Sequence, residues 1–144
     1  MIKNFEDLEI WKCSRVLTKE IYRLTADQKF SRDFKFRDQI RGAVISIMSN
    51  IAEGYERGGN QEFIQFLYIA KASCGEVRSL LYVALDEGYL TPKQFEELIE
   101  SFKRLSVMTS NLIDYLRRSS FKGAKYNEAA PGNRSPAPNR PQTA

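Results

Sequence analysis

The chain has 144 residues, of which 42% are hydrophobic and 28% charged, a composition typical of one soluble, packed domain. Histidine is absent, which excludes Ser-His-Asp triads, Cys-His dyads and zinc sites that use histidine. Lys and Arg outnumber Asp and Glu by 22 to 18, and the resulting charge of +4 favours an acidic partner such as nucleic acid. The positions of the basic residues decide how far that interpretation holds.

The N-terminal sequence MIKNFEDLEIW carries charges where a signal peptide needs an apolar run, and the longest apolar stretch, from Ala43 to Met48, is too short to cross a bilayer. Cys13 and Cys74 form no CxxC motif, so we expect two small buried thiols rather than a disulfide or a zinc site. These features predict a cytoplasmic protein with no membrane partner, no metal and no cofactor.

Apolar residues recur at spacings of three and four, which predicts helices over residues 5–25, 34–57, 60–88 and 91–119. The longest stripe consists of Phe63, Leu67, Ala70, Cys74, Val77, Leu81 and Ala84. Gly88 is placed to end the third helix. Thr91, Pro92 and Gln94 are placed to begin the fourth, with Thr91 as N-cap and Gln94 completing a capping box. No segment alternates with the period of a strand.

Short connections make consecutive helices antiparallel, so the predicted fold is all-α, an up-down-up-down four-helix bundle formed by residues 1–120. Residues 121–144 contain four of the five prolines and no large apolar residue after Tyr126. We therefore predict a disordered, basic C-terminal tail there.

Two of the predicted helices carry apolar residues outside their main stripes. The extra positions are Ile45, Met48 and Ala52 on the second helix and Ile64, Tyr68 and Leu80 on the third. This coverage is wider than a monomeric bundle needs, so we expect self-association; the alternative is that these residues only thicken the core.

The second helix also contains polar residues, among them Ser46, Asn50 and Glu53, that have possible partners on the third helix. Glu53 and Glu62 flank the Gly58-Gly59 turn and could form an acid-base or metal pair, with Glu76 as a third carboxylate. A di-metal bundle would use Glu-x-x-His motifs, which a chain without histidine cannot supply. A polar network that fixes the helix register is the preferred interpretation, and no catalytic residue is predicted. The segment from Gly54 to Gly59 lacks the features of a phosphate loop.

Basic residues gather in two places. Residues 29–41 contain five of them, including Arg37 and Arg41, interleaved with Phe30, Phe34 and Phe36. If exposed, this segment suits phosphate contacts and base stacking. Alternatively, the charges form a solvated face while the phenylalanines close the end of the bundle. The connection between the third and fourth helices falls at the same end, and its acidic residues could pair with the cations; they are Asp86, Glu87, Glu96, Glu97 and Glu100. At the opposite end we expect Arg57, Arg117, Arg118, Lys122 and Lys125 to gather.

Several motifs together resemble the four-helix-bundle proteins of 23S rRNA intervening sequences. They are the Phe5-x-Asp-Leu-x-Ile-Trp11 opening, the tract QIRGAVISIMSNIAEG at 39–54, the segment Asn60-Gln-Glu-Phe-x-x-Phe-Leu-x-Ile-Ala70, and Gly88-Tyr-Leu90. The resemblance covers residues 5–118. Two positions depart from the usual pattern: Gly42, where a second basic residue is common, and Met48, where proline is common. The first departure weakens a phosphate site near Arg41, and the second predicts a straighter helix.

The resemblance implies a bundle that assembles into five-subunit rings, a homopentamer. It also implies similarity to the accessory proteins of diversity-generating retroelements, which bind a reverse transcriptase and nucleic acid. It says little about the family's biochemical role.

Our leading hypothesis is a non-enzymatic homo-oligomer that contacts structured RNA or DNA through Arg37, Arg41, Arg57, Arg117, Arg118 and Lys122. The alternative is a protein-interaction adaptor that docks a reverse transcriptase or another effector without binding nucleic acid. A metal-dependent enzyme built on Glu53, Glu62 and Glu76 is the third hypothesis.

Overall fold

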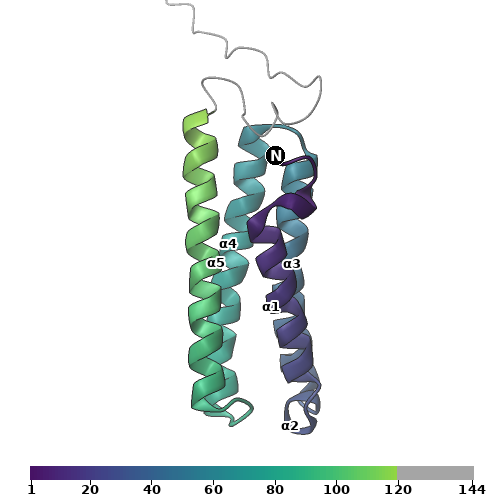
Figure 1. Cartoon of the computed structure of the whole chain (residues 1–144). Helices are drawn as coiled ribbons and strands as arrows, with labels where there is room; N and C mark the ends of the chain where they lie inside the picture. The colour runs from purple at the N-terminus through teal and green to yellow at the C-terminus, as the bar shows by residue number, and fades with distance from the viewer. Residues whose placement is uncertain (120–144) are drawn as a thin grey trace, which may run out of the picture.

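Four long helices run alternately in opposite directions and pack side by side (Figure 1). The computed structural model describes residues 1–119. The elements in chain order are the 3-10 turn η1 (Phe5–Asp7), α1 (Glu9–Thr25), the short α2 (Gln28–Ser31), α3 (Phe34–Glu56), α4 (Asn60–Asp86) and α5 (Pro92–Ser119). The predicted all-α antiparallel bundle is confirmed, and α3 continues unbroken through Met48. The predicted tail, residues 121–144, lies outside the described residues.

The helices do not pack equally closely around the bundle. The most extensive contacts join α3 to α4 and α4 to α5, followed by α1 to α3, whereas α1 and α5 contact one another much less. The α1–α5 edge is therefore the open side of the bundle.

The core contains the predicted apolar stripe of α4 together with apolar residues of the other helices. Every residue of the stripe from Phe63 to Ala84 on α4 is fully buried, as are Ile40, Val44 and Ile51 on α3. Thr109 of α5 is polar but also fully buried, and its hydroxyl donates a hydrogen bond to the Leu105 carbonyl (2.8 Å). A polar residue is tolerated there because its donor is satisfied within the helix.

Both predicted helix boundaries near residue 90 are confirmed. Gly88 adopts a φ of 70°, and the N–H of Tyr89 donates to the Ala84 carbonyl, which forms a Schellman ending. The Thr91 N–H donates to Gln94 Oε1 (2.9 Å) while the Gln94 N–H donates to Thr91 Oγ1 (3.1 Å), so the capping box is complete.

Two expectations for the N-terminal helix were wrong. The helix does not begin at residue 5, because Asp7 caps the separate turn η1 and Leu8 is extended with its side chain buried, so α1 starts at Glu9. Cys13 is only half-buried, and Ser14 takes the core position beside it. Ser14 is accommodated there because its hydroxyl donates to the Trp11 carbonyl (2.8 Å).

Aromatic side chains close the end of the bundle that contains α2. Phe30 is buried and its ring lies 5.4 Å from Phe36 and 4.9 Å from Tyr89 between centroids. The Tyr89 hydroxyl donates to Asp33 Oδ2 (2.8 Å), which joins the start of α3 to the α4–α5 connection. Two of the three phenylalanines thus pack as the alternative interpretation predicted, while Phe34 is 65% exposed. The segment from α2 to the start of α3 and the α4–α5 connection therefore meet through aromatic contacts and the Tyr89–Asp33 hydrogen bond.

Candidate nucleic-acid interface

Three of the predicted site arginines lie at the end of the bundle formed by the α3–α4 turn and the last turn of α5 (Figure 1). Arg57 follows α3, and its guanidinium lies 5.2 Å from the centroid of the Phe66 ring. Arg117 donates a hydrogen bond to the Tyr68 hydroxyl and lies 6.0 Å from that ring. Arg118 is exposed. We call Arg57, Arg117 and Arg118 the arginine end; rings on α4 hold two of its guanidinium groups.

Close helix packing brings the parts of the arginine end together. Gly54 is buried where α3 crosses α4, and a Cβ at this position would lie 2.6 Å from the Phe66 Cβ, so only glycine fits. Gly58 has a φ of 83° and allows the tight turn into α4. The buried Asn60 side chain then donates from Nδ2 to the Leu116 carbonyl (3.0 Å), which fixes the start of α4 to the end of α5.

The start of α4 adds a positive potential at the same end. Gly59 is its N-cap and supplies no side-chain acceptor, so the helix dipole is not capped by that residue. Glu62 lies in the first turn and offsets part of the potential. The arrangement of helix start and neighbouring arginines suits a phosphate better than a carboxylate-rich partner.

The other two predicted arginines, Arg37 and Arg41, lie at the opposite end of the bundle, near α2. Arg37 forms an ion pair with Asp38 (3.0 Å), donates to the Ser31 carbonyl (3.2 Å) and lies 5.1 Å from the Phe34 ring. Its guanidinium is therefore anchored at the protein surface.

Arg41 is half-buried and caps the end of α1. Its Nε donates to Thr25 Oγ1 (2.8 Å), its Nη2 donates to the Tyr22 carbonyl (3.4 Å), and the guanidinium lies 4.4 Å from the Tyr22 ring. A cation at a helix C-terminus interacts favourably with the helix dipole. Arg41 thus has a structural role that the sequence pattern did not reveal.

The predicted residues within the described range therefore form two separate groups at opposite ends of the bundle, as we expected from the sequence. The fourth predicted site residue at the arginine end, Lys122, lies outside the described residues. A further pair was missed: the Arg15 guanidinium lies 5.8 Å from the Trp11 ring on α1. The signal in the sequence was the spacing of Trp11, Arg15, Thr18 and Tyr22 by four, three and four, which places them on one side of a helix.

The sequence matches the model of the family described as 23S rRNA-intervening sequence protein over residues 6–111. The chain belongs to this family. No curated protein matches it.

One solved structure with this fold is similar to the family member described here. It is the crystal structure of a protein with unknown function from the S23 ribosomal protein family, from Bacteroides thetaiotaomicron VPI-5482. The TM-score is 0.66 at 21% sequence identity, and the alignment covers 72% of this chain and 97% of that chain. This likeness shows a shared fold. The expected similarity to retroelement accessory proteins stays a prediction.

In this 23S rRNA-intervening sequence protein, the polar residues between α3 and α4 form only part of the predicted network, in which Ser46 and Ser73 join the two helices. The hydroxyl oxygens of Ser46 and Ser73 lie 2.9 Å apart, and Asn50 Nδ2 donates to the Ser46 carbonyl (2.7 Å). Glu53 and Glu62 are both exposed. Within residues 1–119, no group of three His, Cys, Asp or Glu side chains is placed to hold a metal ion.

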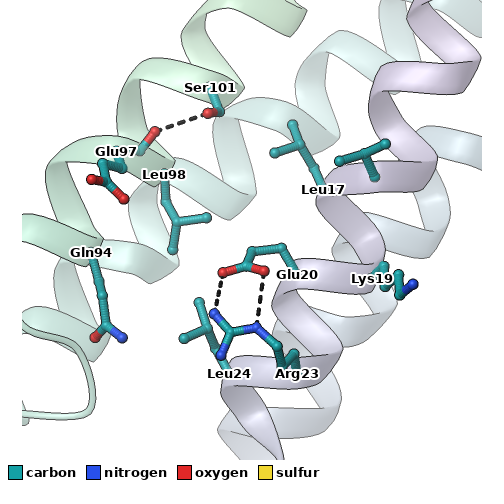
Figure 2. Close-up of a pocket in the computed structure, with 10 residues that line it drawn as sticks. Leu17, Lys19, Glu20, Arg23, Leu24, Gln94, Glu97, Leu98 and Ser101 are labelled. Carbon is teal, nitrogen blue, oxygen red and sulfur yellow. Dashed lines mark hydrogen bonds and ion pairs between the residues drawn. The ribbon is translucent and has the colours of Figure 1, made fainter.

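The open α1–α5 edge forms a groove of about 510 Å³ (Figure 2). Leu17, Leu24 and Leu98 line it together with polar side chains from both helices. Arg23 donates from Nε to Glu20 Oε2 (3.1 Å), and this hydrogen bond lowers the pKa of the Glu20 carboxyl. Glu20 is therefore held ionised and is poorly suited to donate a proton as a general acid.

Burial governs the two thiols of this family member. It raises the pKa of Cys74 to about 12 and also raises the pKa of the half-buried Cys13. Both thiols are thus protonated near neutral pH, which disfavours a nucleophilic role because the thiolate is the reactive form. Among residues 1–119, every helix is too short or too polar to span a lipid bilayer.

Proposed function

We propose that this protein is a non-enzymatic homo-oligomer that associates with structured RNA through its arginine end. The observation that carries the proposal is the gathering of Arg57, Arg117 and Arg118 around the start of α4. Two of these guanidinium groups are held against aromatic rings, so less side-chain entropy is lost when they contact a phosphate.

The charge distribution along the sequence supports this proposal. Residues 121–144 contain Lys122, Lys125, Arg134 and Arg140 against Glu128, a balance of +3 within the total of +4. Residues 1–120 therefore carry only +1. The excess charge follows directly after α5, next in sequence to Arg117 and Arg118, so local clusters and not a uniformly basic surface would attract an RNA.

Self-association is supported by the composition of the outer α3 and α4 surface. Ile45 on α3 and Tyr68, Ile69 and Val83 on α4 are all more than two-fifths exposed, whereas Met48, Ala52, Ile64 and Leu80 are half-buried. Gly42, Ser49, Ala72 and Ser79 lie among the exposed apolar residues and carry no charge, and Glu76 is a charged residue in the same row of α4. Such a surface favours contact with another subunit. Repetition in a ring, for which the family resemblance suggests five subunits, would multiply weak RNA contacts.

The direct test measures how much structured RNA the purified protein retains at several salt concentrations around about 100 mM. Phosphate contacts are strongly salt-dependent in this range. Arg117→Ala with Arg118→Ala should weaken retention and reduce the salt slope by about 1 to 2, because each arginine neutralises one phosphate. Arg104→Ala, which removes an exposed arginine of α5 thirteen positions before Arg117, is the matched control. If wild-type protein retains no RNA at any salt concentration in the series, the proposal is wrong.

A protein-interaction adaptor is the second candidate, and the α1–α5 groove is the observation that favours it. Val16, beside three leucines of the groove, is 68% exposed. An apolar floor with polar rims is the kind of surface that accepts an amphipathic helix of a partner. Purification from its host with one stoichiometric protein and without nucleic acid would favour the adaptor, and Val16→Glu should then abolish the complex.

A further inference from the structure

We propose that the outer surface shared by α1 and α3 binds single-stranded nucleic acid. Its bases would stack on aromatic side chains that each lie beside an arginine. The inference rests on the proposed association with nucleic acid and assigns it a second, distinct surface. Three arginine–aromatic pairs make up this surface, here called the arginine–aromatic strip: Arg15 with Trp11, Arg41 with Tyr22, and Arg37 with Phe34.

The α1 members of the strip lie along one side of their helix. Trp11, Arg15 and Tyr22 are separated by four and seven residues, which returns the chain to nearly the same side of an α-helix. Thr18 lies between them in the same row, and its hydroxyl is 3.5 Å from the Val44 carbonyl of α3. The row therefore borders α3.

The α3 members follow the same rule and meet the first row. Phe34, Arg37 and Arg41 are separated by three and four residues, so they also share one side of a helix. Arg41 reaches across to α1, where it contacts the ring and the carbonyl of Tyr22. α1 and α3 run antiparallel (Figure 1). The two rows therefore join at the Tyr22–Arg41 contact, and the α3 row continues to Phe34 at the start of α3, next to α2.

Exposure distinguishes two rings of the strip from the core, whereas the third ring, Trp11, is half-buried and packs edge-on against Phe5. Phe34 is 65% exposed and Tyr22 is 39% exposed, while Phe30 and Phe36 of the same segment pack inside the bundle end. A phenylalanine at the surface with a guanidinium 5.1 Å from its ring offers a π-face next to a fixed cation. Protein surfaces that bind single strands combine these two elements.

The charge of the strip favours nucleic acid over an apolar partner. Arg15, Arg37 and Arg41 belong to it and Lys19 is exposed nearby, while Asp38 neutralises part of this charge through its pair with Arg37. Contact with an apolar protein surface would remove these cations from water at a desolvation cost, whereas phosphates would neutralise them. Exposed rings can stack only on bases that are not already stacked in a duplex, which points to a single strand.

The experiment uses the intact chain and an oligouridylate of roughly 10 nucleotides, a length within the site sizes of single-strand binding surfaces. Trp11 is the sole tryptophan, so its fluorescence reports directly on the strip. Anisotropy of a labelled oligonucleotide gives the affinity independently. We compare wild type with Phe34→Ala, with Phe34→Tyr, which keeps a ring, and with Tyr82→Ala, which removes a ring that is 56% exposed on the α4–α5 side.

We expect the oligonucleotide to quench Trp11 and Phe34→Ala to weaken binding about ten-fold, the loss of one stacked base. Phe34→Tyr should restore the affinity, Tyr82→Ala should leave it unchanged, and binding of a duplex of the same length should not respond to Phe34→Ala. Equal affinities for wild type and Phe34→Ala would overturn the strip, while structured RNA retention that depends on Arg117 and Arg118 would leave the proposed function standing. If the wild-type protein binds neither the oligonucleotide nor structured RNA, both the strip and the proposed function are wrong. A change of oligomer mass in Phe34→Ala without a change of affinity per subunit would identify the strip as a subunit contact and overturn this inference.

Discussion

Arg41 Nε lies 2.8 Å from the hydroxyl oxygen of Thr25, and this hydrogen bond fastens the middle of α3 to the end of α1. The Thr25 hydroxyl in turn donates to the Ile21 carbonyl (2.7 Å), so the buried threonine is satisfied in both directions. One arginine therefore closes the C-terminus of α1 from a neighbouring helix.

Arg41→Ala should lower the free energy of unfolding by about 2 kcal/mol, because it removes a charged hydrogen bond and a cation at a helix C-terminus. Urea denaturation monitored by circular dichroism measures the loss. Arg32→Ala, an exposed arginine in the same basic segment, should change stability by no more than about 0.5 kcal/mol. Equal stability of the two variants would mean that the cap contributes nothing.

Substitutions of two glycines in α3 should have opposite effects. At Gly54 an added Cβ meets the Phe66 Cβ at 2.6 Å and Phe63 at 3.0 Å, so Gly54→Ala should destabilise the protein by about 1 to 3 kcal/mol. At Gly42 a Cβ meets nothing within 4 Å, so Gly42→Ala should stabilise it by about 0.5 to 1 kcal/mol through helix propensity. Thermal melting of both variants checks the prediction, which fails if Gly54→Ala melts at or above the wild-type temperature.

The buried thiol of Cys74 should make stability decrease at alkaline pH. Its pKa is raised from 9.0 to about 12 on folding, so the unfolded chain loses this proton first. The protonated thiol makes its full contribution to the free energy of unfolding below pH 9. That contribution is lost as the pH rises from 9 towards 12, and the free energy of unfolding falls by at most about 1.4 kcal/mol per pH unit. The measurement is the difference in unfolding free energy between wild type and Cys74→Ala at several pH values, which should narrow across this range; a constant difference would contradict it.

Deleting residues 121–144 should remove +3 of the +4 net charge and little stability. We expect the melting temperature of residues 1–120 to match that of the full chain while RNA retention at low salt decreases, because the attraction of phosphates scales with local positive charge. Thermal melting of the shortened protein tests the expected stability, and RNA binding of the same preparation tests the expected loss of retention. A large drop in melting temperature would show that the segment stabilises the fold.

A charge on the outer surface of α4 should dissociate the oligomer. Ile69 is 49% exposed there, and Ile69→Glu would bury a carboxylate in the proposed subunit contact at a cost of several kcal/mol. Val107→Glu places the same charge at a site on α5 that is 57% exposed and serves as the matched control. Light scattering coupled to size exclusion gives the masses. If wild type is already monomeric, or if both variants keep its oligomeric mass, this surface is not the contact.

The bundle itself was predictable because its signals are local. The spacing of Phe63, Leu67 and Ala70 reports a helical stripe whatever surrounds it, and the reciprocal bonds of Thr91 and Gln94 involve residues three apart. Short motifs spread from Phe5 to Leu90 carried the family resemblance that the match over residues 6–111 confirms.

Only the tertiary structure decided which basic and aromatic side chains face outwards. Phe30, Phe34 and Phe36 have the same chemistry in the sequence, yet Tyr89 packs against two of them and leaves Phe34 exposed. Arg41 caps α1 because that helix ends beside it, although sixteen residues separate Arg41 from Thr25. Spacing along one helix determines which residues share a side, whereas burial and hydrogen bonding depend on neighbours that other helices supply, and those neighbours are set by the packing of the whole bundle.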